Sequence, residues 1–256
     1  MTTSNASNQR ADSRNPFARF YDFAVSPRGF FTILIVYTIA HILLRLWISP
    51  NLGIDDVEQA MFARDWRLGY NPRQPPLYTW LLFGGISVLG QSLLTHLIVK
   101  YSALAAMYAA SYGAARQLLQ SPQSAALATY ALVLLYNVGY GAHVGYTHSL
   151  LLSVFIFATL WTLARAFESG RLRDYVLLGI ALGLGFLTKF GFALFVAPLL
   201  VGCCFAAPLR RGLFNWRTLI ALAIAALILA APVYWMLHVR YSYENTLRQV
   251  AHVAAH

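Results

Sequence analysis

Hydrophobic and polar positions fall in long alternating blocks along this chain. A polar start is followed by apolar runs over residues 30–48, 77–94, 97–119, 125–140, 149–167, 175–187, 192–207 and 219–237. A helix needs about 20 apolar residues to cross the hydrocarbon core of a bilayer, and several of these runs approach that length. Backbone polar groups inside a bilayer must be hydrogen-bonded within their own segment, which favours helices. The pattern therefore predicts an all-α polytopic membrane protein.

Composition agrees with this class and removes two others. Of the 256 residues, 59% are hydrophobic and 11% are charged, and the mean hydropathy is +0.56, which excludes an ordinary soluble domain. The formal net charge is +10, but the arginines stand at the ends of apolar runs and form no single patch. The positive charge therefore indicates loop orientation rather than nucleic-acid binding. Cys203 and Cys204 are neighbours within an apolar run and are interpreted as packing residues.

The amino-terminal part of the chain predicts the orientation of the rest. Residues 1–29 are polar and arginine-containing, and we expect them to form a cytoplasmic N-terminal tail that is interfacial near residues 17–23. The run 30–48 has no small-residue cleavage site, so it is predicted to be an uncleaved signal anchor. Residues 30–256 then form the transmembrane domain.

The run 77–94 decides on which side every later loop lies. It follows Pro75-Pro76 and is interrupted by Gly84-Gly85 and Gly90. If it crossed the bilayer, each later arginine cluster would lie opposite the amino-terminal arginines. If it is a re-entrant or interfacial segment, every cluster returns to the cytoplasm, as the positive-inside rule requires. We therefore predict about seven full spans and one re-entrant segment.

The longest polar interruption is the loop 49–76, which this parity places on the outer face. It contains four of the nine acidic residues: Asp55, Asp56, Glu58 and Asp65. The segment 143–148, Lys189 and residues 238–256 fall on the same face. ATP and nucleotide-activated substrates are absent there, so the expected substrate is a lipid-borne or small periplasmic compound.

The acidic cluster has two interpretations. Asp55 as an N-cap with Glu58 three residues later is a capping-box variant, which would begin an interfacial helix. Clustered carboxylates at a membrane surface also suit a general base, or the binding of a divalent cation against a phosphate. The sequence leaves both interpretations open for Asp55, whereas a cap does not require Asp56.

Basic and imidazole side chains supply further candidates. Arg73, which precedes the stiff Pro-Pro pair, is either a loop residue at headgroup level or a phosphate clamp. His143 and His148 are one residue further apart than a helical zinc pair, so a zinc site is disfavoured, and His148 is the better functional candidate. Lys189 is one of two lysines and lies opposite the arginine clusters, which favours a local anionic partner over a snorkelling role.

Three segments together resemble a known family. Taken in order, GIDDVEQAMFARDWRLGYNPRQPPLYTWL, GYTHSLLL and GLGFLTKFGFAL resemble the polyprenol-phosphate-sugar-dependent glycosyltransferases of the GT-C fold. The nearest branch resembles lipid A aminoarabinose transferase and protein O-mannosyltransferase, a group similar to glycosyltransferase family 39. The resemblance covers roughly residues 30–200. It depends on the order and spacing of an acidic pair, a Gly-Tyr turn, Pro-Pro-Leu with a following Trp, and Leu-Thr-Lys.

The resemblance implies an activity, a fold and a location. The activity is inverting transfer of a sugar from a polyprenyl-phosphate donor to an envelope lipid or glycan acceptor, as in lipopolysaccharide modification. The fold is a GT-C-type transmembrane bundle with periplasmic juxtamembrane helices in the first outer loop. The location is the inner membrane of a bacterium, with several spans and a cytoplasmic amino terminus.

The resemblance also implies roles for individual residues. Asp55 would be the general base and Asp56 its acidic companion, while Lys189 and Arg73 would bind the donor phosphate. Further candidate contacts to the donor or acceptor are Glu58, Tyr70 and His148. A divalent cation is a candidate cofactor. The expected partners are the lipid-linked sugar, the acceptor and membrane lipids, with no nucleic acid.

Departures from the family pattern keep two alternatives open. Gln74 stands where many relatives have a lysine, and His148 stands where they commonly have an aspartate. The chain ends at His256, so we expect the family's C-terminal part to be lacking, and an inactive truncated transferase is one alternative. The other is a non-enzymatic protein that binds or transports a lipid carrier. Against it, ionisable residues in the spans are few (His41, Arg45 and Lys100), and no internal repeat is present.

Overall fold

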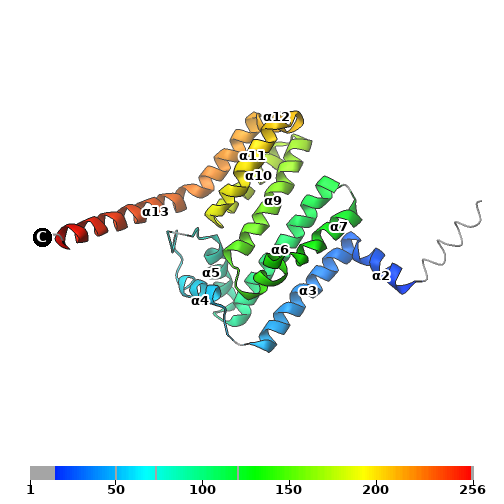
Figure 1. Ribbon diagram of the computed structural model, residues 1–256, viewed down its shortest axis with the longest axis horizontal. Helices are drawn as coiled ribbons and strands as arrows, with labels where there is room; N and C mark the ends of the chain where they lie inside the picture. The colour runs from blue at the N-terminus through cyan, green and yellow to red at the C-terminus, as the bar shows by residue number, and fades with distance from the viewer. Residues whose placement is uncertain (1–14, 50, 73, 120, 255–256) are drawn as a thin grey trace, which may run out of the picture.

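The computed structural model describes residues 15–254, apart from 50, 73 and 120 (Figure 1). These residues form helices and connecting loops; the β-structure among them is one isolated bridge between Asn71 and Gln74. The helices are α2 (Pro16–Ala24), α3 (Pro27–Ile48), α4 (Ile54–Phe62), α5 (Leu77–Leu89), α6 (Leu93–Leu119), α7 (Pro122–Tyr130), η1 (Ala131–Leu134), η2 (Asn137–Gly141), α8 (Ala142–Val144), α9 (His148–Ser169), α10 (Leu172–Phe186), η3 (Phe190–Phe192), α11 (Ala193–Phe205), α12 (Ala207–Leu213) and α13 (Trp216–Ala254). The all-α prediction is confirmed.

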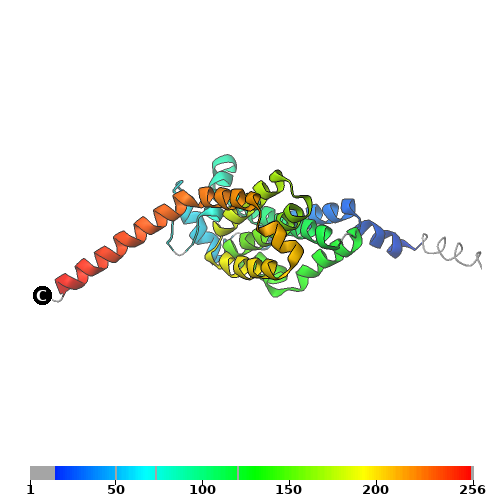
Figure 2. The same ribbon diagram turned by 90° about the horizontal axis from the view of Figure 1, so that it is seen from above.

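The helices lie roughly alongside one another in a bundle. α6 packs against α3, α7 and α9, and α10 packs between α9 and α13. The short helices α4 and α5 sit at one end of the bundle, and α12 sits at the other (Figure 1). α13 follows the bundle and then extends beyond it towards the carboxyl terminus (Figure 2).

Local sequence explains where the first long helices begin. The Ser26 hydroxyl accepts a hydrogen bond from the backbone N–H of Gly29 at 3.0 Å, and Pro27 occupies the first helical position of α3. α7 begins in the same way, with Ser121 as the capping residue and Pro122 after it. Serine satisfies an otherwise unpaired N–H at a helix start, and proline lacks one, so this order of residues favours initiation there.

The expectation of seven full spans is wrong. Among the described residues, four helices are long and apolar enough to cross a membrane, α3, α6, α9 and the first part of α13, or up to six if each of two bent pairs is one span. The run 125–140 is bent by 74° between η1 and η2, and α11 meets α12 at 118°. α10 has 15 residues, which gives a length of about 22 Å, less than the roughly 30 Å hydrocarbon core.

The prediction for the run 77–94 agrees with the structure. α5 has 13 residues, about 20 Å of helix, so it is too short to cross. It ends at Gly90, whose φ of 79° lies in the region that favours glycine, and α6 begins three residues later. The segment therefore forms a short helix and a turn before the first long helix of the bundle core.

Small residues allow α10 and α13 to pack closely. A Cβ atom at Gly179 would lie 2.5 Å from the carbonyl oxygen of Ala221, and one at Gly183 would lie 2.9 Å from the side chain of Ile228. Packing between membrane helices depends on such close approach, because lipid is as apolar as the helix surfaces. The glycines of α10 therefore serve close helix packing.

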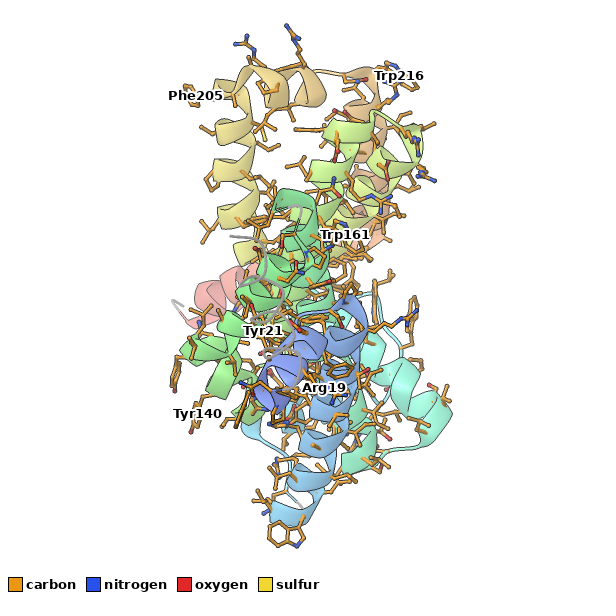
Figure 3. All side chains as sticks on the ribbon, turned by 90° about the vertical axis from the view of Figure 1, so that its right-hand side faces the viewer. Arg19, Tyr21, Tyr140, Trp161, Phe205 and Trp216 are labelled. Carbon is orange, nitrogen blue, oxygen red and sulfur yellow. The ribbon has the colours of Figure 1, made fainter. Side chains whose placement is uncertain are left out.

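The two ends of the bundle separate the arginine clusters from the polar loop. At one end, the Gln117 amide of α6 donates to the Glu168 carboxylate of α9, and the Tyr175 hydroxyl at the start of α10 donates to Gly212 O of α12 at 2.9 Å. The start of α13 lies at the same end, where Figure 3 labels Trp216 near Phe205. The loop 49–76 lies at the opposite end. The arginine clusters and the loop 49–76 therefore lie at opposite ends of the bundle, as expected if they face opposite sides of a membrane.

Candidate functional site

The acidic pair begins α4, but Asp55 is not its cap. The N-cap position is Gly53, which makes no side-chain cap, and Asp55 and Asp56 lie in the first turn. The capping-box interpretation is therefore wrong. A Cβ atom at residue 53 would lie 2.9 Å from the carbonyl oxygen of Val144, so the close approach of α8 favours glycine there. Carboxylates in a first turn interact favourably with the helix dipole.

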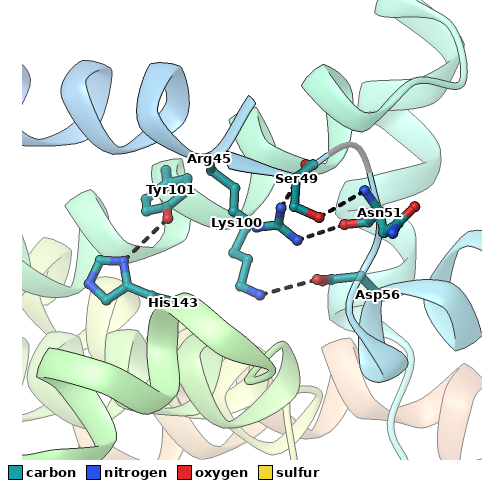
Figure 4. Close-up of polar contacts among 7 residues, drawn as sticks. All are labelled: Arg45, Ser49, Asn51, Asp56, Lys100, Tyr101 and His143. Atoms are coloured by element: carbon teal, nitrogen blue, oxygen red, sulfur yellow. Dashed lines mark hydrogen bonds and ion pairs between the residues drawn. The ribbon is translucent and has the colours of Figure 1, made fainter. Parts of the chain in front are cut away.

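Asp56 is held by a buried lysine from the middle of the bundle. Its Oδ2 atom lies 3.2 Å from Nζ of Lys100 on α6, and the two side chains are 10% and 3% exposed (Figure 4). A buried ion pair depends on both partners, because either one alone would be an uncompensated charge. The pair therefore fixes the start of α4 against α6.

Asp55 points away from this pair. Its carboxylate is exposed and has no ion pair or hydrogen bond with any described residue, and Glu58 is partly buried without such a partner. Burial raises the pKa of the Tyr78 phenol above its ordinary range, and the nearby carboxylates of Asp56 and Asp55 raise it further. The site thus combines one tied carboxylate, one free carboxylate and a neutral buried phenol.

Hydrogen bonds close the rest of the loop onto α5. The Thr79 hydroxyl donates to Oε1 of Gln59 at 2.6 Å, and Trp80 Nε1 donates to the carbonyl oxygen of Arg67 at 2.7 Å. The Tyr70 hydroxyl donates to Asp65 O at 2.9 Å and accepts from the backbone N–H of Arg67. The hydroxyl of Tyr70, a predicted ligand contact, is therefore engaged within the loop.

The third segment, around Thr188, lies directly against this loop. The backbone N–H of Leu77 donates to Leu187 O at 3.1 Å, and His148 Nδ1 donates to Thr188 O at 3.2 Å. The imidazole of His148 is buried, with its centroid 5.7 Å from that of Tyr78. The structure thus brings together segments that are more than 100 residues apart.

Two buried polar atoms beside this contact lack partners among the described residues. These are Nε2 of His148 and Oε1 of Gln74, and both residues line the same small cavity together with Gln59 and Thr79. A buried polar atom without a hydrogen bond costs free energy. The space between them does not admit a water-sized group, so both atoms lie in a tightly closed contact.

Lys189 follows this contact and is exposed. Its Nζ atom donates to the Ser149 hydroxyl at 3.0 Å, and no described carboxylate lies within ion-pair distance. The structure therefore gives it a neutral partner. Next to it, Phe190 and Leu187 line an apolar cavity of about 160 Å³ with the Pro-Pro pair and with Pro232 of α13. Arg73, the other predicted phosphate ligand, lies outside the described residues.

The described residues do not form an evident metal site. No three side chains of His, Cys, Asp or Glu gather there in a way that could hold a metal ion. Asp56 is paired with Lys100, whereas Asp55 and Glu58, about one turn apart on α4, have no ion-pair partner among the described residues. The divalent cation therefore stays a prediction.

The sequence indicated most of the residues that gather here but gave Lys100 no role in the candidate site. The loop, His148 and Lys189 were expected together, and the structure places them at one end of the bundle. The missed signal is a lysine inside an apolar run, because an ionisable residue in a membrane segment usually has a partner. Its partner, 44 residues earlier, is not evident before the helices are placed.

Comparisons with known proteins now identify relatives. Residues 73–235 match the family model described as dolichyl-phosphate-mannose-protein mannosyltransferase. The chain is 31% identical over 221 residues to the lipopolysaccharide core galacturonosyltransferase RgtA of Rhizobium johnstonii, covering 86% of this chain and 44% of RgtA. It is 30% identical over 213 residues to an undecaprenyl phosphate-α-4-amino-4-deoxy-L-arabinose arabinosyl transferase of Pseudomonas aeruginosa, covering 76% of this chain and 37% of that protein.

These relatives support the resemblance and also show the extent of the match. The chain spans less than half the length of each of these two relatives. No solved structure shows a significant match to it.

Proposed function

Because the chain belongs to the dolichyl-phosphate-mannose-protein mannosyltransferase family of GT-C glycosyltransferases, we propose that it takes part in sugar transfer from a polyprenyl-phosphate donor. The acceptor is an envelope lipid or glycan, and lipopolysaccharide is the natural candidate because RgtA is named for its core. The observation that carries the proposal is the free carboxylate of Asp55 beside the tied carboxylate of Asp56, at the same end of the bundle as Lys189.

The proposed reaction is a displacement with inversion. An acceptor hydroxyl attacks the anomeric carbon, a new bond forms between that carbon and the acceptor oxygen, and the bond to the donor phosphate oxygen breaks. Asp55 accepts the hydroxyl proton, since its carboxylate has no partner among the described residues. Polyprenyl phosphate leaves with the electron pair, and Lys189 compensates its negative charge, with Arg73 as the second proposed ligand.

The surroundings of Lys189 fit a lipid-linked phosphate. A charged ammonium group with only a hydroxyl partner can bind an anion without breaking an ion pair. The apolar cavity beside it, lined by Leu187 and Phe190, is suited to the first isoprene units of the donor. In this arrangement, the loop end faces the periplasm and the arginine end faces the cytoplasm of a bacterial inner membrane.

Transfer by site variants tests the proposal. The protein is reconstituted in liposomes with radiolabelled polyprenyl-phosphate sugars and an envelope-lipid extract. Asp55→Asn should reduce transfer by about 100-fold or more, because a positioned general base typically contributes that much. Lys189→Ala should also reduce transfer strongly, with a higher KM for the donor, because it removes charge that binds the phosphate.

A loop carboxylate outside the site is the matched control. Asp65 is 72% exposed and is paired with Arg67 at 3.3 Å, so Asp65→Asn should retain transfer. All variants should insert and elute like the unchanged protein. Full activity in both Asp55→Asn and Lys189→Ala would contradict the site assignment.

A further inference from the structure

A second cleft lies beside α3, and Lys189 does not line it. Its polar part is a cavity of about 480 Å³ between α3, α6 and the η2–α8 segment, lined by Tyr37, His41, Arg45, Tyr101 and His143. Its apolar part is a cavity of about 210 Å³ lined by Phe30, Ile33, Leu34, Tyr108 and Tyr130. Tyr37 and Val133 line both cavities, so the two parts adjoin each other.

The polar end carries positive charge without a counter-charge. Arg45 donates to the carbonyl oxygens of Ser49 at 2.8 Å and Asn51 at 2.6 Å, both neutral (Figure 4). Among the described residues no carboxylate lies within ion-pair distance of Arg45, and no acidic residue lines the cavity. A guanidinium has five N–H donors, so donors remain for an anionic ligand.

The groups around Arg45 are arranged for hydrogen bonding. His41 lies one turn earlier on the same helix face, and its Nδ1 donates to Tyr37 O at 2.9 Å, which leaves Nε2 without a partner among the described residues. His143 is fixed between the hydroxyl groups of Tyr37, at 2.8 Å from Nε2, and Tyr101, at 3.2 Å from Nδ1. The cavity thus has a preorganised polar wall beside its charge.

The cleft opens sideways, on the surface where a bilayer would lie. Leu44, Val133 and Tyr140 at its rim are 47%, 46% and 55% exposed. Figure 3 shows Tyr140 projecting outward from the side of the bundle. From Phe30 to Arg45 the cleft follows about 22 Å of α3, most of the thickness of a roughly 30 Å hydrocarbon core. The shape therefore fits a long amphiphile that enters from the membrane.

We propose that this cleft binds an anionic phospholipid, with its phosphate at Arg45 and His41 and an acyl chain against Ile33, Leu34 and Tyr108. The charge selects an anionic headgroup, and the adjoining apolar part selects a long-chain lipid over a free phosphate. This binding is independent of the sugar-transfer chemistry proposed at Asp55.

Lipid retention tests this directly. The protein is purified into phosphatidylcholine nanodiscs and titrated with dioleoyl phosphatidic acid. It is then released from the nanodiscs in the gas phase, where native mass spectrometry counts the lipids that remain bound. We expect retention of one phosphatidic acid with at least tenfold preference over dioleoyl phosphatidylcholine. Arg45→Gln should reduce that preference at least tenfold, and Ile33→Trp, which fills the apolar part, should reduce retention without altering charge.

Controls separate binding from folding. Arg67→Gln removes an exposed arginine outside the cleft and should leave retention unchanged. Because Arg45 also binds loop carbonyls, Arg45→Lys keeps the charge while it disturbs those bonds, and it should retain most of the lipid preference. Equal retention by the unchanged protein and Arg45→Gln, equal retention of the neutral lipid, or retention of polyprenyl phosphate alone would overturn the proposal.

Discussion

The two neighbouring carboxylates of α4 differ because of where the helix directs them. Asp56 faces α6 and meets Lys100, while Asp55, about 100° further round the helix, faces outward. The same residue type therefore serves two purposes. Asp56 anchors the loop to the bundle, and we propose that Asp55 takes the proton of the acceptor hydroxyl.

At the residue scale, the buried pair should be strongly coupled. Lys100→Met leaves Asp56 buried without its partner, which should cost about 3–5 kcal/mol, as breaking buried pairs does elsewhere. Asp56→Asn should also destabilise, but the double variant should lose much less than the sum of the two. Thermal unfolding in detergent, read as a double-mutant cycle, measures this coupling.

The exposed pair of Arg67 and Asp65 is the matched comparison. Its side chains are 66% and 72% exposed, so the same cycle there should give at most about 1 kcal/mol of coupling. Additive losses at Lys100 and Asp56 would show that the contact does not hold α4 in place.

The sequence alone singled out residues whose type and position in the chain suggest a chemical role. The acidic pair, His148 and Lys189 stood out as polar residues near the ends of apolar runs. The partners did not, because Lys100 with Asp56 and Leu77 with Leu187 are contacts between distant segments. Such contacts depend on the packing of helices, which one sequence does not show.

At the scale of elements, the pairing of α10 with α13 supports the Lys189 end of the site. Gly179→Ala would place a Cβ atom 2.5 Å from Ala221 O, against backbone that cannot turn aside. The helices must separate, so we expect a fall in the melting temperature of several degrees, measured by thermal unfolding in detergent.

Gly202→Ala on α11 is the control for that change. A Cβ atom there meets nothing within 4 Å, and alanine is the better helix former, so stability should be unchanged or slightly higher. If Gly179→Ala and Gly202→Ala had the same melting temperature, close packing of α10 on α13 would not be the reason for a glycine at residue 179.

The sequence predicted the positions of the helices well because the apolar runs are long. It overestimated the number of membrane spans because bends within a run are local features. The run 125–140 has the composition of one span, yet it contains a 3-10 turn, a π-helical turn and a 74° bend. Composition averages over such a segment. Hydropathy therefore locates helices better than it counts crossings.

At the scale of the whole molecule, the two ends should be accessible from opposite sides of the membrane. With Cys203 and Cys204 replaced by alanine, Arg67→Cys should react with a membrane-impermeant maleimide in intact spheroplasts. Arg210→Cys should react only after permeabilisation, because arginine-rich loops favour the cytoplasm. Labelling of both from the same side would contradict the proposed orientation.

Whole-molecule organisation also explains how separate motifs become one site. The loop 49–76 packs against α5, against α13 and against the turn that precedes η3. Trp235 of α13 lies so close to Gly69 that a Cβ atom at residue 69 would be 2.2 Å from the Trp235 ring. The polar segments thus gather because the helices that carry them return to the same end of the bundle (Figure 1).

The central claim is that this end of the bundle binds the polyprenyl-phosphate sugar. A photoreactive analogue of such a donor, cross-linked to the protein in liposomes and mapped by mass spectrometry of peptides, tests it most directly. We expect label on α4 or on the segment around Lys189, which is lost when unmodified donor competes and is weaker in Lys189→Ala. Competable label confined to the α12 end, or label unaffected by competing donor, would contradict it.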